Sequence, residues 1–183
     1  MHRILKKDQI LTIPNLLSLV RLALIPLIVW LYCLKQEYIW AVAVVVLSGA
    51  TDVIDGFIAR KYNMISDFGK ILDPIADKLT QAALIVCLLK RYDWMLWLLV
   101  LFAAKEIIMG ISGLVVIKKK DVVNSSQWFG KLTTVVLYGV MILLFLFPGL
   151  PEVIANAMIA LCAAVIILSL VKYLLFYKRL FSR

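Results

Sequence analysis

The chain has 183 residues, of which 64% are hydrophobic, and its mean hydropathy is +0.99. Soluble domains are nearer to half apolar, so this composition excludes an ordinary soluble domain and favours an integral membrane protein. The formal net charge of +9 would suit a nucleic-acid partner in a soluble chain, but here the basic residues lie between long apolar runs. We therefore expect membrane lipid, and no nucleic acid, around this chain.

Six apolar segments follow one another, each near the ~20 residues that a helix needs to cross a bilayer. Backbone polar groups in hydrocarbon must be hydrogen-bonded within their own segment, so each is expected to be a helix. The predicted spans are residues 14–34, 38–59, 72–89, 94–117, 128–147 and 152–176. The sequence thus predicts an all-α integral membrane protein with six transmembrane helices, in which residues 1–183 are expected to form a single membrane domain.

Lysines and arginines distinguish the two sides of the predicted bundle. The basic residues on the side of the N-terminus are Arg3, Lys6, Lys7, Arg60, Lys61, Lys70, Lys118, Lys119, Lys120, Lys178, Arg179 and Arg183. The opposite ends carry Lys35, Lys90 and Arg91. Because cytoplasmic loops are enriched in basic residues, we expect a multi-pass protein of the cell membrane with both termini in the cytoplasm.

The stretch TDVIDGFIARKYNMISDFGKILDPIAD, residues 51–77, holds five of the eleven acidic residues. Four residues of the second predicted span share one helix face, since they are spaced at i, i+3, i+4 and i+7: Asp52, Asp55, Gly56 and Ala59. Three more lie four apart near the start of the third span: Gly69, Asp73 and Asp77. Two adjacent helix ends therefore present four carboxylates toward each other, which predicts a polar active-site cavity at the cytoplasmic side.

Four neighbouring carboxylates repel one another and resist desolvation. Protonation, pairing with Arg60 or Lys78, or a divalent cation would each relieve the repulsion. Oxygen ligands favour a hard cation such as Mg²⁺ or Mn²⁺, which also shares phosphate oxygens. The small residues on the same faces leave room for an anion to approach the backbone. These features favour a metal–phosphate site over a solvated acidic loop.

The pattern D-x2-D-G-x2-A-R-x8-G-x3-D-x3-D resembles the signature of the CDP-alcohol phosphatidyltransferase family. All eight fixed positions match: Asp52, Asp55, Gly56, Ala59, Arg60, Gly69, Asp73 and Asp77. The resemblance extends to IPNLLSLVRLALIP near the N-terminus, to the six spans and to the length of the chain.

The resemblance implies a metal-dependent transferase of phospholipid biosynthesis, which moves a phosphatidyl group from CDP-diacylglycerol to an alcohol and releases CMP. It assigns two Mg²⁺ or Mn²⁺ ions to Asp52, Asp55, Asp73 and Asp77, with Asp77 also as the catalytic general base. The residues that it places beside the CDP-lipid are Asn15, Ser18, Gly56, Ala59, Arg60 and Gly69. It also implies that the chain can form a homodimer.

Three cations are candidates to hold a phosphate of the acceptor: Arg21, Lys105 and Lys131. Arg21 lies within the first span and needs an anionic partner there, either an aspartate or a phosphate. Lys105 precedes Glu106 in mid-span; a local ion pair is the alternative, although adjacent helical residues point about 100° apart. Lys131 is expected near the start of the fifth helix, where a cation opposes the helix dipole unless an anion is bound.

Within the family, the chain most resembles the bacterial phosphatidylglycerophosphate synthases, which implies sn-glycerol 3-phosphate as the acceptor. That group usually has arginine where Lys105 stands, and a lysine lacks the bidentate fork of arginine. A cardiolipin synthase that uses phosphatidylglycerol is therefore the alternative, and serine or inositol phosphate as acceptor carries less weight. From another class, a divalent-metal transporter would use the same acids, but transporter sites usually lie near the bilayer midplane.

Overall fold

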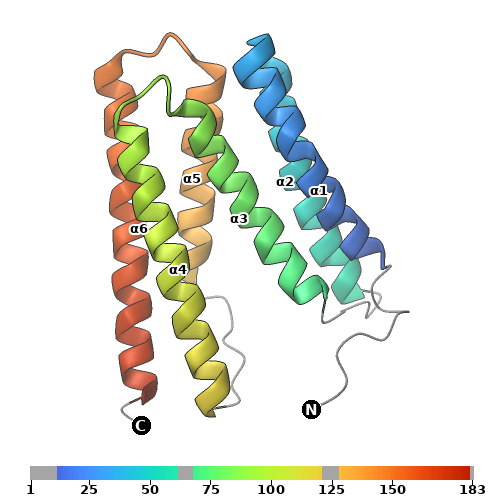
Figure 1. Ribbon diagram of the computed structural model, residues 1–183, viewed down its shortest axis with the longest axis vertical. Helices are drawn as coiled ribbons and strands as arrows, with labels where there is room; N and C mark the ends of the chain where they lie inside the picture. The colour runs from blue at the N-terminus through green and yellow to red at the C-terminus, as the bar shows by residue number, and fades with distance from the viewer. Residues whose placement is uncertain (1–11, 62–67, 121–127, 182–183) are drawn as a thin grey trace. The chain divides into compact units, whose positions relative to one another are not determined.

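The computed structural model describes residues 12–61, 68–120 and 128–181, which are helical apart from short turns (Figure 1). The helices are α1 (Ile13–Val29), continued by a π-helical segment η2 (Trp30–Lys35), then α2 (Tyr38–Lys61), α3 (Gly69–Leu88), α4 (Trp94–Lys120), α5 (Trp128–Leu146) and α6 (Glu152–Phe181). Each of the six predicted segments corresponds to one helix, so the all-α prediction is confirmed.

Local sequence accounts for the limits of the first helix. Pro14 lies in its first turn, where the missing N–H of proline removes no helical hydrogen bond. The continuous helical segment of α1 and η2 ends at Gln36, which has a left-handed backbone with a φ of 57°. The Glu37 N–H donates back to the carbonyl of Leu31 at 3.0 Å. The chain can therefore reverse directly into α2.

Five helical segments are long and apolar enough to cross a membrane: Ile13–Lys35, Tyr38–Ile58, Trp94–Ser112, Trp128–Leu146 and Glu152–Phe176. Many of their large apolar side chains are exposed, as lipid-facing residues would be. The described part of α3 is not among them, because its first half carries Lys70, Asp73, Asp77 and Lys78. Five of the six predicted segments thus form helices with the length and composition that a membrane span requires.

The chain divides into two compact units, Met1–Cys87 and Leu88–Arg183. Within the first unit, α1 packs along α2; within the second, α6 packs against both α4 and α5 (Figure 1). Asn15, Ser18 and Arg21 are all buried and recur every three residues on α1, so they form a polar face within the first unit.

A glycine allows close packing of α5 on α6 in the second unit. A Cβ atom at Gly130 would lie 2.6 Å from the hydroxyl oxygen of Tyr173. The Tyr173 ring is itself buried against Phe129, with the two ring centroids 4.5 Å apart, and it packs on Met109. The tyrosine therefore has little freedom to move away from a larger residue at position 130.

We predict that Gly130→Ala lowers the stability of the folded protein by about 1 kcal/mol. Overpacking typically costs about 1–3 kcal/mol, whereas alanine returns up to about 1 kcal/mol through its better helix propensity. In the background of Tyr173→Phe, which removes the clashing oxygen, the same glycine substitution should be neutral or stabilising. Thermal unfolding in detergent measures both effects, and a Gly130→Ala effect of the same sign and size in both backgrounds would contradict this packing.

Candidate active site

Arg21 lies at the centre of a carboxylate cluster formed by α2 and α3. Its Nη1 is 2.5 Å from Asp52 Oδ1 and 3.1 Å from Asp73 Oδ1. Its Nη2 is 2.6 Å from Asp55 Oδ2. The side chain is only 1% exposed. One guanidinium from α1 therefore links two residues of α2 to one residue of α3.

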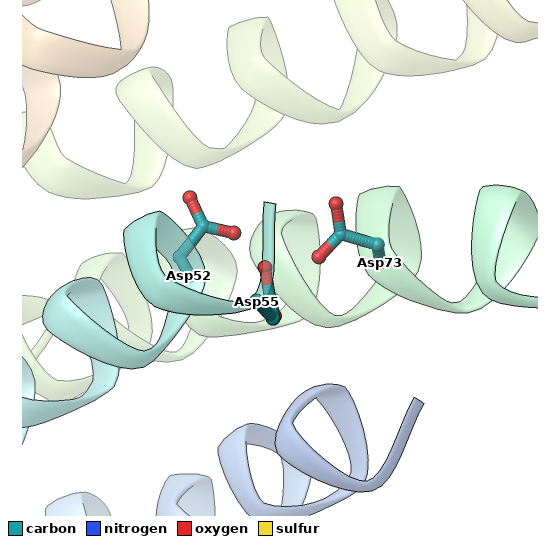
Figure 2. Close-up of side chains that lie close together, drawn as sticks. All are labelled: Asp52, Asp55 and Asp73. Carbon is teal, nitrogen blue, oxygen red and sulfur yellow. The ribbon is translucent and has the colours of Figure 1, made fainter. Parts of the chain in front are cut away.

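The three carboxylates point into a common space (Figure 2). Asp52, Asp55 and Asp73 each offer one oxygen such that all three oxygens lie within 4.8 Å of one another. The Asp55 side chain is 4% exposed, whereas those of Asp52 and Asp73 are 45% and 47% exposed. The cluster thus has a buried floor at Asp55 and an accessible rim at the other two carboxylates.

Asp77 lies one turn beyond Asp73 on α3 and is held by a neighbour that the sequence analysis missed. Gln81 Nε2 donates to both carboxylate oxygens, at 3.1 and 3.0 Å, and Gln81 is itself buried. Lys78 Nζ lies 3.4 Å from Asp77 Oδ2. Asp77 is not a member of the three-carboxylate group, but it is near enough to Asp52 for their charges to repel. The i, i+4 spacing of Asp77 and Gln81 is the signal that could have predicted this contact.

The residues predicted to border the CDP-lipid are distributed over the same three helices: Asn15, Ser18, Gly56, Ala59, Arg60 and Gly69. Asn15 and Ser18 are buried on the face of α1 that carries Arg21. The Ser18 hydroxyl donates to the Pro14 carbonyl at 3.2 Å, so it already has a partner within its own helix. The side chains of Ala59 and Arg60 lie outside the described residues.

The two lysines predicted to hold an acceptor phosphate lie in the second unit. Lys105 is buried, and its Nζ is 2.6 Å from Glu106 Oε1. This is the local ion pair that the sequence analysis gave as the alternative; it forms although the Cβ directions diverge, because two long side chains can bend toward each other. Lys131 lies in the first turn of α5, as its sequence position predicted, and its side chain is exposed.

Comparison with known proteins decides the family. Residues 11–171 match the sequence model of the CDP-alcohol phosphatidyltransferases. This chain belongs to that family. The resemblance inferred from the spacing of Asp52, Asp55, Asp73 and Asp77 and their neighbours is thereby confirmed.

The relatives of this member of the family carry two different names. This chain is 44% identical to the cardiolipin synthase (CMP-forming) of Streptomyces coelicolor over 105 residues. The matched stretch covers 54% of this chain and 48% of that protein. This chain is also 43% identical to the CDP-diacylglycerol–glycerol-3-phosphate 3-phosphatidyltransferase of Rickettsia bellii over 83 residues. That stretch covers 44% of this chain and 46% of that protein. A putative cardiolipin synthase of Mycobacterium bovis is 44% identical over 79 residues, 43% of this chain and 38% of that protein. The chain thus spans less than half the length of each of these relatives.

The different exposure of the carboxylates predicts how strongly each one contributes to the stability of the folded protein. Asp55→Asn should lower the free energy of unfolding by about 3 kcal/mol, because it removes a buried charge that compensates Arg21. Asp52→Asn is the matched control and should cost about 1 kcal/mol or less, because solvent screens a half-exposed ion pair. Both are measured by unfolding in detergent with a chelator present. An Asp52→Asn variant that is as unstable as the Asp55→Asn variant would contradict the burial described here.

Proposed function

We propose that the protein transfers a phosphatidyl group from CDP-diacylglycerol to an alcohol, with release of CMP, in phospholipid biosynthesis. The observation that carries the proposal is the convergence of three carboxylates from two helices around one site, in a chain that matches this transferase family over residues 11–171. Membership of a transferase family favours this reaction over the alternative of a divalent-metal transporter.

The carboxylate cluster fits a hard divalent cation. Its donors are all carboxylate oxygens, they come within 4.8 Å of one another, and its rim is accessible to a phosphate. We propose that Asp52, Asp55, Asp73 and the adjacent Asp77 hold two Mg²⁺ or Mn²⁺ ions. Such ions, when bound, would neutralise charge on the diphosphate and stabilise the leaving CMP.

Asp77 is the proposed general base. It would accept the proton of the acceptor hydroxyl while the hydroxyl oxygen attacks the phosphorus that carries diacylglycerol. The bond from this phosphorus to the bridging oxygen breaks, and CMP leaves. The two hydrogen bonds from Gln81 support this role because they fix the orientation of the Asp77 carboxylate.

The remaining side chains are proposed to bind and orient the two substrates. The residues proposed for the CDP-lipid are Asn15, Ser18, Gly56, Ala59, Arg60 and Gly69. Arg21 Nε is a buried donor that has no hydrogen-bond acceptor within the described residues, which supports a contact with a phosphate oxygen. Lys105 and Lys131 are proposed to hold the acceptor phosphate, and for Lys105 this requires sharing its ammonium with Glu106.

We propose sn-glycerol 3-phosphate as the acceptor, as the name of the Rickettsia relative suggests. Phosphatidylglycerol is the second candidate, and a specific observation favours it. The Streptomyces relative, matched over the longer stretch of 105 residues, is named a cardiolipin synthase, and Lys105 is already paired with Glu106. An acceptor without a phosphate monoester needs less positive charge in its pocket.

The basic residues support a proposed topology in the cell membrane. We propose a single membrane domain in which α3 also crosses the bilayer, with both termini and the carboxylate cluster on the cytoplasmic side. The homodimer implied by the family resemblance is part of the same proposal.

The reaction is tested with purified protein in detergent, CDP-diacylglycerol and either Mg²⁺ or Mn²⁺. Glycerol 3-phosphate, phosphatidylglycerol, serine and inositol phosphate are offered in turn, and the lipid product is identified by mass. We expect CMP release and phosphatidylglycerophosphate with the first acceptor; cardiolipin with the second would establish the alternative. Absence of CMP with every acceptor would contradict the proposed reaction.

Asp73→Asn should lower the rate of CMP release by about 10²–10³-fold or more, the scale expected when an electrostatic stabiliser of the reaction is lost. The protein should remain folded, because Asp73 is half-exposed. Asp93→Asn, at an exposed aspartate in the turn after α3, is the matched control and should keep wild-type activity. Near-normal turnover in a folded Asp73→Asn protein would remove the metal assignment.

Lys131→Ala should raise the KM for glycerol 3-phosphate about tenfold, which corresponds to about 1.4 kcal/mol of lost binding, and leave kcat within a few-fold of wild type. Lys90→Ala removes an exposed lysine from the opposite predicted side and is the control for net charge. An unchanged KM for the acceptor would place Lys131 outside the pocket.

A further inference from the structure

Arg21 occupies the carboxylates that are proposed to bind metal. It contacts one oxygen of each member of the cluster: Asp52 Oδ1, Asp55 Oδ2 and Asp73 Oδ1. Through Nη1 alone it bridges α2 and α3. This guanidinium compensates carboxylate charges that would otherwise repel one another inside a largely apolar chain.

We propose that Arg21 is a built-in counter-cation, which holds the cluster together until divalent ions bind and displace it from part of the cluster. Arg21 would then lower the affinity of the site for divalent ions while it stabilises the metal-free fold. This inference rests on the proposed metal site and adds a residue of α1 that competes for its ligands.

The competition follows from the position of the guanidinium. An ion shared by Asp52, Asp55 and Asp73 would lie close to the guanidinium that contacts all three, and two positive charges at such a separation repel strongly in a poorly solvated site. Arg21 is 1% exposed, so its side chain cannot simply turn into solvent. An ion that takes the carboxylate oxygens that Arg21 contacts would therefore alter at least part of these contacts.

The hydrogen bonding of Arg21 supplies a second, independent observation. Its Nη1 and Nη2 have carboxylate acceptors, but its buried Nε has none within the described residues. A buried donor without an acceptor is costly and is usually satisfied by a ligand or water. Arg21 Nε is thus a donor that could serve an incoming hydrogen-bond acceptor, such as a phosphate oxygen.

Three roles of Arg21 make different predictions for a neutral substitution. A counter-cation predicts lower stability without metal and higher affinity for divalent ions. A residue that pre-arranges the carboxylates for metal predicts lower stability and lower affinity. A purely structural ion pair predicts lower stability and unchanged affinity. Metal affinity in the absence of lipid substrates therefore separates the three.

The test compares wild type with Arg21→Gln, using Mn²⁺ as the probe and the electron paramagnetic resonance signal of free Mn²⁺ as the readout. We expect Arg21→Gln to melt at a lower temperature than wild type in chelator, to regain most of this loss in saturating Mn²⁺, and to bind Mn²⁺ at least tenfold more tightly. Ile28→Val, at a buried residue on the same helix, controls for destabilisation alone and should leave Mn²⁺ affinity unchanged. Equal or weaker Mn²⁺ binding by Arg21→Gln would overturn the inference.

A second measurement uses wild-type protein in case Arg21→Gln does not fold. With ¹⁵N-labelled arginine, the Arg21 side-chain resonances are identified by their loss in Arg21→Lys and followed during a Mg²⁺ titration. We expect them to shift as Mg²⁺ saturates the site; resonances that stay unchanged at saturation would overturn the inference. If neither wild type nor Arg21→Gln binds Mn²⁺, the proposed metal site itself is wrong. If wild type binds Mn²⁺ and the substitution does not increase its affinity, the metal site stands and only the competition by Arg21 is wrong.

Discussion

The contact of one buried guanidinium with three carboxylates governs the organisation of the first unit. Charged groups inside an apolar protein are tolerated when they are paired, and removing a partner leaves an uncompensated charge. Arg21 satisfies this requirement for Asp52, Asp55 and Asp73 together. The contact therefore fixes a point on α1 against points on α2 and α3, which apolar packing, being non-directional, could not specify by itself.

The same contact explains how the cluster can be both stable and reactive. Asp55 is the buried floor, whereas Asp52 and Asp73 keep nearly half of their side-chain surface exposed at the rim. All three project from helices, so their positions are set by rigid elements and not by loops. In our proposal, divalent ions and the diphosphate of CDP-diacylglycerol approach from the rim, and Asp77 receives the acceptor proton beside them.

Much of this arrangement could be predicted from the sequence. Apolar runs near the length of a membrane span predicted every helix, because the bilayer permits few other structures. The spacing of Asp52 and Asp55, and that of Asp73 and Asp77, predicted which carboxylates share a helix face. Residues 72–89 were predicted as a span as well, although the first half of α3 carries Asp73, Asp77 and Lys78.

Side-chain pairing was less predictable, because spacing fixes the direction of Cβ and not the reach of a long side chain. Arg21 was expected to have an anionic partner, yet an aspartate and a phosphate fitted the sequence equally well. Lys105 and Glu106 pair although their Cβ directions diverge. Gln81 orients Asp77 through ordinary i, i+4 contact, and only the folded helix distinguishes this pair from many others at the same spacing.

Anomalous diffraction from crystals of the protein grown with Mn²⁺ tests the central claim most directly. The account predicts an anomalous peak about 2–2.5 Å from oxygens of Asp52, Asp55 and Asp73, the range for oxygen-bound divalent ions, with Arg21 withdrawn from at least one of them. Manganese bound elsewhere, with Arg21 still in contact with all three carboxylates, would contradict it.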